Sequence, residues 1–406
     1  MKIEELVKKF KKFFGEKGYT IGNELSLVPQ RKYDEVSPFY EFAKTFRPSV
    51  GATTFLKELK EGNDPYAVVQ RCYRHPDIKF GRIGDGRHLA LFRIAGLGTR
   101  LKNKEKIMKD FYEFISSLDI NKNKIWASYF GGGNIKSKVE ITEGPKSFSK
   151  DMEPQFFEED TERKEIFLSL GISEEKIIPL PNKEMPPNWT NFSGLPASDR
   201  YGGYRSHLYY EISKPCSRAC YPEHNEECKR FIEFAVFIDE TIEKVEKNGK
   251  WLFIPFYEMG KFPFSVCGLG IERLTMITEG YSSVDQLEII RSPLKEFLKQ
   301  IKKSEDSFPL EEIKKITTTI SLLQSILFLT SDGAKATTRR NRDRQFIELL
   351  KKSLVMISNI SELVVNSKEK VTEILLLDIA NYFTKEYPYV IKNIDKALNY
   401  LFEKRR

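Results

Sequence analysis

The sequence has few cysteines and histidines and no long hydrophobic run. Five cysteines in 406 residues form no disulfide framework, and their odd number favours free thiols or metal ligation. No segment approaches the roughly 18 consecutive apolar residues of a membrane-spanning helix, and Met1–Glu5 lacks the apolar core of a signal peptide. We therefore expect a cytoplasmic protein that does not associate with membranes.

What is present fits a globular protein of more than one domain. Hydrophobic residues make up 40% of the chain and charged residues 31%, and the length suffices for about two or three domains with real cores. The net charge of +8, from 66 basic and 58 acidic residues, suits contact with a polyanion without identifying one.

The hydrophobic pattern changes along the chain. Residues 3–17 have apolar residues at helical spacing and predict an amphipathic helix packed on a sheet. Short apolar or aromatic stretches separated by loops with glycine and proline predict a mainly antiparallel sheet flanked by helices, an α+β fold. They lie at 66–73, 88–94, 124–129, 204–212, 251–256 and 262–267. After about residue 285 glycine and proline become rare, so we expect a domain with the sheet over 1–284 and an all-α domain over 285–406.

The segment Gly268–Arg273 has the composition of a nucleotide-binding turn. Gly268 and Gly270 would let a strand approach a flat ligand closely. Arg273, at the start of the helix that follows, could stack on an adenine ring or hold a phosphate. The alternative is an ordinary strand-to-helix turn with a surface arginine.

A second segment adds a cluster of cations. A strand that ends at Arg74 leads into a glycine-bearing loop with Arg82 and Arg87, and a returning strand starts near His88. Such a hairpin gathers guanidinium groups at one end, which is typical of a cradle for ATP phosphates. The alternative is a basic hairpin on the protein surface.

A third segment carries four soft metal ligands within thirteen residues. They are Cys216, Cys220, His224 and Cys228. Three thiolates and an imidazole form a normal tetrahedral zinc set, although Pro222 argues against one continuous helix here. Free thiols are the alternative to a structural zinc ion.

The ordered motifs resemble the alanyl-tRNA synthetase family of class II aminoacyl-tRNA synthetases. The resemblance rests on the runs Ser26–Pro29, Phe46–Val50, Gln70–Arg74, Gly86–Phe92 and Gly268–Leu274. It continues into the second half, where Phe328–Gly333, Arg339–Arg344, Phe346–Leu354 and Glu386–Pro388 are similar to the family's helical tRNA-recognition domain. Because the chain ends at Arg406, we expect no editing domain and no dimerising tail, which favours a monomer.

The resemblance implies roles on the nucleotide side. Arg74 would bind the α-phosphate of ATP, and Arg273 would stack on the adenine or hold the γ-phosphate. The other residues that it implies at the site of ATP and Mg²⁺ are Asp77, Arg82, Arg87, His88, Phe92, Gly268 and Gly270.

The same resemblance implies substrate and tRNA sites, with departures. Arg47, Val236 and Val266 would lie on the amino-acid side. Val266 stands where the family has an Asp that holds the substrate ammonium group, and Val236 aligns with an expected Asn. A basic stretch, Arg339, Arg340, Arg342 and Arg344, would form a phosphate-binding face for tRNA, with a solvated helix start as the alternative.

The sequence thus predicts an ATP-dependent aminoacyl-tRNA ligase with amino acid and tRNA as substrates. A second hypothesis is a paralogue that activates a different amino acid for tRNA or for a non-ribosomal acceptor. A third is a tRNA-binding regulator that has lost catalysis. Retention of both Arg74 and Arg273 argues against the third, while Val266 argues against ordinary alanine charging.

Overall fold

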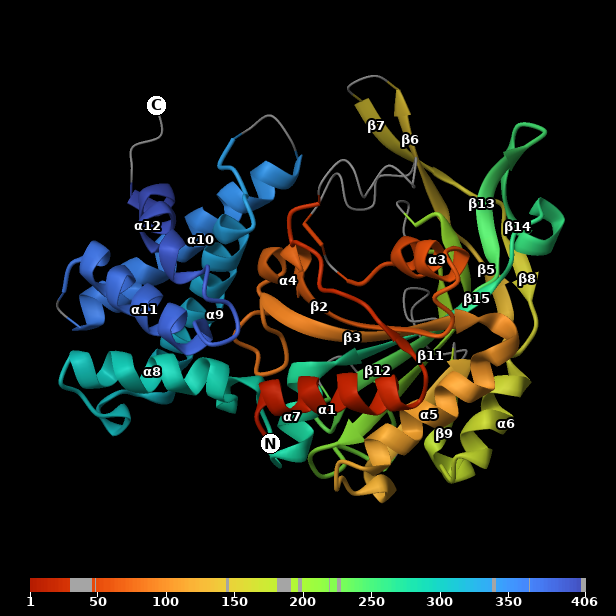
Figure 1. Cartoon of the computed structure of the whole chain (residues 1–406), viewed down its shortest axis with the longest axis horizontal. Coiled ribbons are helices and arrows are strands. Elements are labelled where there is room, and N and C mark those ends of the chain that lie inside the picture. The colour runs from red at the N-terminus through yellow and green to blue at the C-terminus, as the bar shows by residue number, and fades with distance from the viewer. Residues whose placement is uncertain are drawn as a thin grey trace.

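The protein is described from a computed structural model in which a twisted sheet lies beside a set of helices (Figure 1). The structure describes residues 1–29, 46–47, 49–143, 146–180, 191–195, 199–218, 220–224, 228–337, 341–364 and 366–402. None of the helices within these ranges has the length and apolar character needed to cross a membrane.

The sheet follows the order β1-β2-β3-β15-β12-β11-β13-β14, with β10 and β4 also paired to β11 and β9 paired to β4. Its strands are β1 (Thr20–Ile21), β2 (Tyr66–Tyr73), β3 (Leu91–Arg100), β4 (Ile125–Phe130), β9 (Ile177–Leu180), β10 (Phe192–Ser193), β11 (Tyr201–Glu211), β12 (Phe231–Glu240), β13 (Ile242–Lys247), β14 (Lys250–Pro255) and β15 (Phe264–Gly270). Two short pairs complete the strands described: β5 (Gly133–Ile135) with β8 (Gln155–Phe157), and β6 (Lys138–Glu143) with β7 (Lys146–Asp151). The pairs β1–β2 and β4–β9 are parallel and the other described pairs are antiparallel. The expected α+β fold with a mainly antiparallel sheet is confirmed.

Helices cover both faces of the central strands because side chains alternate between the faces. Val69, Cys267 and Leu269 belong to the large core that includes the first helix, whereas Val68 and Val266 pack in a smaller cluster with Phe55. The helices around the sheet are α1 (Ile3–Glu16), α3 (Ala52–Lys60), α4 (His75–Lys79), α5 (Lys104–Ser116), α6 (Thr161–Ser169) and α7 (Ile271–Thr278).

The opening helix forms as its apolar spacing predicts. Leu6, Phe10 and Phe14 recur every four residues on one face of α1, and each is fully buried. Phe10 and Phe14 pack against Phe114 of α5, with ring centroids 5.6 and 5.5 Å apart. Such aromatic pairs stabilise the core beyond the burial of their area.

The second half of the chain is helical, as predicted. Its helices are α8 (Glu288–Gln300), α9 (Leu310–Ser331), α10 (Asn341–Val364), α11 (Lys368–Phe383) and α12 (Ile394–Phe402). α9 is buried all round from Ile316 to Thr330, so it forms the centre of this part.

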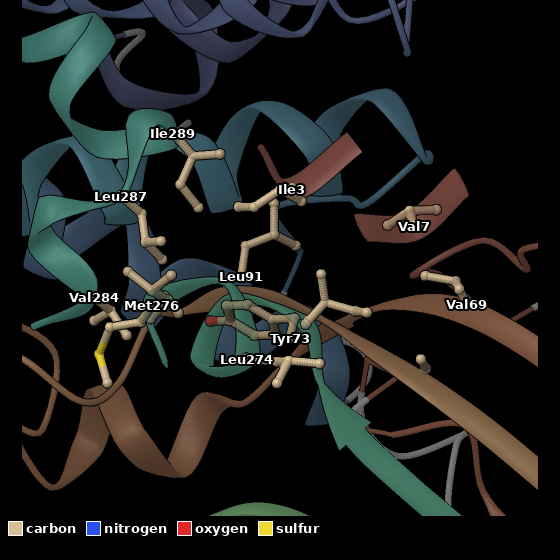
Figure 2. Packing of buried hydrophobic residues seen from close by; sticks show 14 of the residues in the cluster. Ile3, Val7, Val69, Tyr73, Leu91, Leu274, Met276, Val284, Leu287 and Ile289 are labelled. Atoms are coloured by element: carbon tan, nitrogen blue, oxygen red, sulfur yellow. The ribbon is translucent and has the colours of Figure 1, made fainter. Parts of the chain in front are cut away.

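The sheet and the helices share one continuous core. Ile3 of α1, Leu91 of β3, Met276 of α7 and Ile289 of α8 converge in Figure 2. Val284 is buried in the same cluster. The division into two domains at residue 284 stays a prediction, because buried side chains are continuous across that point.

A buried arginine connects the two halves. The Arg71 Nε atom lies 2.8 Å from Glu24, and its Nη2 lies 3.5 Å from Asp332. The guanidinium group also stacks over Phe328 and Tyr387, 4.9 and 4.6 Å from the ring centroids. A guanidinium that is paired and stacked in this way tolerates burial and fixes the helices against β2.

A second buried ion network lies beneath the sheet. Asp239 is 1% exposed and accepts a hydrogen bond from the Ser265 hydroxyl at 2.7 Å. Arg163 Nη2 lies 2.6 Å and Lys104 Nζ 3.4 Å from the same carboxylate. Although burial disfavours the charged form, Arg163 and Lys104 hold the pKa of Asp239 below its ordinary value.

We predict that Asp239→Asn lowers the free energy of unfolding by about 3–5 kcal/mol, because it removes the nearer of the two carboxylates that face the buried Arg163 and leaves only Asp160, 3.7 Å from Arg163 Nε. Urea denaturation measures this loss. Glu246→Gln, an exposed change in β13, is the control and should stay within about 0.5 kcal/mol of the parent. Equal midpoints for the two variants would show that the network contributes little.

Candidate active site

Two cavities adjoin on one face of the central strands. The smaller encloses about 190 Å³ and the larger about 1130 Å³. They share the lining residues Ile94, Gly268, Val236 and Arg205. A ligand in one cavity can therefore meet a ligand in the other.

The shared floor comes from the register of β3, β15 and β12. Gly268 lies opposite Gly96 on one side and Val236 on the other, and Val266 lies opposite Ile238. A Cβ atom at Gly268 would stand 3.2 Å from Val236 Cγ1, which is tighter than usual. Glycine therefore keeps the floor flat where the cavities meet, as the sequence predicts for close approach of a ligand.

The smaller cavity collects positive charge from separate segments. Arg74 follows β2, Arg87 lies in the loop before β3, and Arg273 lies in the first turn of α7. Arg74 Nε lies 3.6 Å from Asp77, which is 2% exposed in its side chain, and Arg82 Nη1 lies 3.5 Å from the same carboxylate. The acid orients two arginines while their other N–H groups remain available to an anion.

The loop between β2 and β3 is held by Asp85. Its carboxylate accepts hydrogen bonds from the backbone N–H groups of Arg87 and His88, at 2.7 and 2.9 Å, and lies 2.6 Å from His88 Nδ1. Burial opposes ionisation of Asp85, but His88 and these N–H donors hold its pKa below the ordinary value. Gly84 and Gly86 have φ of +94° and +82°, so both turns need glycine.

Arg273 is fixed against β12. Its Nη1 donates a hydrogen bond to the Glu233 carbonyl oxygen at 2.8 Å. Burial disfavours the Glu233 carboxylate, yet positive charges that include Arg273 and Arg205 hold its pKa below the ordinary value. Glu233 thus remains an anion at the edge of the smaller cavity.

Three potential metal ligands meet beside this edge. One ligand atom each from His207, Glu223 and Glu233 lies within 4.8 Å of the others. Burial, aided by Arg205, lowers the pKa of His207 to about 4. Burial and the charge of Glu233 raise the pKa of Glu223 to about 7. The two carboxylates fit a hard divalent cation, since nearby like charges are costly unless they are neutralised.

The structure brings most of the predicted nucleotide residues together. Those that line the smaller cavity are Arg74, Asp77, Arg87, His88, Phe92, Gly268, Gly270 and Arg273. Arg82 reaches the site through Asp77. Val236 and Val266 line the larger cavity. Arg47 lines neither cavity; it is 4% exposed and its Nε donates to the Ser26 carbonyl oxygen at 3.0 Å.

The basic stretch before and within α10 does not form one exposed face. Arg342 is 8% exposed and donates to the Pro29 carbonyl oxygen at 3.2 Å, so its side chain is turned inward. Arg344 is exposed. Arg339 and Arg340 lie outside the described residues.

The cysteine cluster assembles although its spacing is irregular. Cys220 Sγ lies 3.5 Å from Cys216 Sγ and 3.7 Å from Cys228 Sγ, and His224 Nε2 lies 3.1 Å from Cys216 Sγ. Tetrahedral zinc with Zn–S bonds of about 2.3 Å requires sulfur atoms about 3.8 Å apart. His224 Nδ1 donates to the Tyr221 carbonyl oxygen at 2.5 Å, which leaves Nε2 for a metal.

Sequence reasoning missed the contribution of Arg205 and Glu223 to this region. None of the motifs described above contains Arg205, so no sequence signal singled it out. Glu223 comes from the connection between β11 and β12, within the run of metal ligands, and only folding carries it to Glu233.

The amino-acid sequence is similar to those of several alanine–tRNA ligases. The alanine–tRNA ligase of Borrelia hermsii is 29% identical over 293 residues, 70% of this chain and 41% of that protein. The enzyme of the same name from Rubrobacter xylanophilus is 25% identical over 301 residues, 71% of this chain and 29% of that protein. The chain spans less than half the length of these relatives. No protein-family model matches it.

Solved structures give a weaker likeness. Pyrrolysyl-tRNA synthetase from Desulfitobacterium hafniense aligns with a TM-score of 0.33 and 12% identity, over 70% of this chain and 72% of that one. The RNA binding domain of threonyl-tRNA synthetase from Cryptosporidium parvum aligns with a TM-score of 0.36 and 10% identity, over 68% and 64%. The described residues form a mainly antiparallel sheet with flanking helices, followed by further helices. By sequence, the chain is similar to alanyl-tRNA synthetases.

A buried glutamate behind the smaller cavity predicts a pH effect. Glu272 is 4% exposed, and it accepts a hydrogen bond from the Arg93 backbone N–H at 2.8 Å. Burial raises its pKa to about 7 from an ordinary value of 4.5, although the charge of Arg93 opposes this shift. The folded state then holds more protons than the unfolded state between these values, so stability falls as pH rises.

We expect the parent to lose about 1–3 kcal/mol of stability relative to Glu272→Gln as pH rises from 5 to 8. Urea denaturation of both proteins across this pH range measures the difference. Parallel pH profiles for the two proteins would contradict the raised pKa of Glu272.

Proposed function

We propose that the protein is an ATP-dependent ligase that activates an amino acid as its adenylate and transfers it to tRNA. The observation that carries the proposal is the junction of the two cavities over one floor, with Arg74, Arg87 and Arg273 around the smaller. An arrangement of this kind suits a nucleotide beside a second substrate. The similarity to alanine–tRNA ligases supports the same function.

In this reaction the chain's residues act by position and charge. A carboxylate oxygen of the amino acid attacks the α-phosphorus of ATP. The bond between this phosphorus and the oxygen that bridges to the β-phosphorus breaks, and pyrophosphate leaves with the electron pair. Arg74 would stabilise charge on the α-phosphate, and Arg273 would hold the adenine or the γ-phosphate. Asp77 would keep Arg74 and Arg82 oriented.

The implied Mg²⁺ has suitable donors nearby. Glu233 and Glu223 would hold it, because paired carboxylate oxygens are hard ligands at the edge of the ATP cavity. When bound, the ion neutralises phosphate charge. Arg273 would at the same time keep Glu233 in place through its main-chain carbonyl.

A substrate other than alanine is the second candidate. The larger cavity, at about 1130 Å³, is spacious for a methyl side chain, since sites for drug-sized ligands span about 300–1,000 Å³. Val266 lines it where an ammonium-binding carboxylate was expected. Both observations favour a paralogue that activates a larger amino acid, for tRNA or for another acceptor.

The helical half would contact the tRNA. Arg344 is exposed on α10 and Arg339 and Arg340 precede this helix in sequence; together they would bind backbone phosphates. The inward position of Arg342 suits a structural role. A tRNA-binding regulator without catalysis remains the third candidate.

Zinc is proposed as a structural ion at the cysteine cluster. Cys216, Cys220, His224 and Cys228 would hold it, and it would close the connection between β11 and β12. This connection also carries Glu223, so the zinc ion would help to position Glu223 beside Glu233.

We expect the purified protein to catalyse pyrophosphate exchange that depends on ATP and one or a few amino acids. Arg74→Ala and Arg273→Ala should each lower kcat/KM about 100- to 1,000-fold, because each removes a donor to developing charge. Arg100→Ala, at a partly exposed pair with Asp64 that lines neither cavity, is the control.

The amino acid that supports exchange separates the candidates. Exchange with alanine alone supports an alanyl-type enzyme, and exchange with a larger acid supports the paralogue. If no amino acid supports pyrophosphate exchange while the protein binds tRNA saturably, the protein is the regulator and the ligase proposal is wrong.

Metal analysis should find about one zinc per chain, and Cys220→Ser should lose the ion and lower the melting temperature by several degrees, about 2 °C or more. Ser217→Ala, an exposed change in the same loop, should keep both zinc and stability. Less than about a tenth of an equivalent of zinc in the parent would favour free thiols.

A further inference from the structure

Arg205 lies where the two cavities meet. It sits on β11 opposite Ile238 of β12 and lines both the smaller and the larger cavity. Among the described residues, it is the one cationic side chain that both cavities share. The other cationic residues around the smaller cavity are Arg74, Arg87 and Arg273, with His88 beside them.

The Arg205 side chain is prepared for an anion that the described residues do not supply. Its Nε is buried without a hydrogen-bond partner among them. The charge of Arg205 helps to lower the pKa of Glu233 and opposes the rise in the pKa of Glu223, but no ion pair joins Arg205 to either glutamate within the described part of the chain. A buried guanidinium donor without an acceptor is costly, so this position favours binding of an anionic ligand.

We propose that Arg205 binds the carboxylate of the acid that the enzyme activates. The ligand class is a free carboxylic acid in the larger cavity, with its carboxylate at the junction and its side chain directed away from ATP. The planar guanidinium suits a carboxylate because it can donate two parallel hydrogen bonds. This proposal rests on the proposed adenylation and extends it to the second substrate.

Charge at the junction explains why a cation is needed there. The carboxylate and the α-phosphate are both anions, and they must come into contact before the oxygen–phosphorus bond forms and pyrophosphate leaves. A guanidinium between them lowers their repulsion and orients the attacking oxygen. No proton is transferred in this step, so Arg205 needs no acid–base role and acts as a binding residue.

A structural role for Arg205 makes a different prediction. If it only balances the charge of Glu233 and Glu223, its loss should lower stability or metal binding and affect ATP and the acid alike. If it binds the carboxylate, its loss should raise the KM for the acid and leave that for ATP nearly unchanged. The split between the two substrates therefore separates the roles.

The experiment compares Arg205→Met and Arg205→Lys with the parent and with Arg100→Met as control. Pyrophosphate exchange gives KM for ATP and for each active acid. Thermal shift with a panel of twenty free amino acids, and with the matching amides, gives binding without catalysis, in the presence of a non-hydrolysable ATP analogue. Melting of each variant without ligand reports folding.

We expect Arg205→Met to raise the KM for the acid about 10- to 100-fold, the loss of a charge-assisted pair. Arg205→Lys should recover part of this, and KM for ATP should change less than about threefold. Amino acids that bind should raise the melting temperature of the parent protein, and the matching amides should not. Stabilisation by the acid should disappear in Arg205→Met.

The outcomes distinguish the two proposals. Exchange in the parent with an unchanged KM for the acid in Arg205→Met would overturn the role of Arg205 and leave the ligase intact. Acid binding that depends on Arg205, without exchange, would support the carboxylate site and overturn the ligase. A rise in KM for ATP alone would make Arg205 a phosphate residue. Absence of both exchange and acid binding would overturn both proposals.

Discussion

The pairing register of β3, β15 and β12 is the constraint on which the candidate active site depends. It places Gly268 between Gly96 and Val236, so the adjacent strands β3 and β15 present no side chain at one point of the sheet. Both cavities share this floor, and the cations stand around it. A shift of one residue in this register would turn Val266 and Val236 away from the cavities, to the opposite face of the sheet.

Two pairs of arginines occupy different environments: Arg71 and Arg93 are buried, and Arg205 and Arg273 are partly exposed. Arg71 and Arg93 lie between the sheet and the helices, where carboxylates and aromatic rings surround them; Arg93 Nη2 lies 3.0 Å from Glu386. Arg205 and Arg273 line the cavities, and Arg205 Nε has no hydrogen-bond partner among the described residues. The first pair connects the two halves of the chain, and the second brings positive charge to the cavities. Both halves therefore contribute to one rigid support for the site, since their core is continuous.

Local patterns predicted much of the fold. The amphipathic spacing of Leu6, Phe10 and Phe14 led to α1, and short apolar stretches led to β2, β3, β4, β11, β14 and β15, but no stretch was predicted at the central strand β12. The motifs also selected Arg74, Arg87, Gly268 and Arg273 at the smaller cavity, because strand ends and the turns that follow them lie close in sequence. The same reasoning was less successful for Arg47 and Arg342, which are turned into the protein. Composition reports charge but not the direction of a side chain.

The sequence by itself determined which side chains are available to ligands: glycines that allow close approach, arginines that suit anions, and three cysteines with a histidine that suit a soft metal ion. It also determined the elements in which they lie, because periodicity and turn residues act over a few neighbours. The tertiary structure alone decided which distant groups meet. Arg205 joins two cavities, and Glu223 approaches Glu233, only because β11 pairs with β12 and the connection between them folds back. Such proximity depends on long-range pairing, which no local pattern specifies.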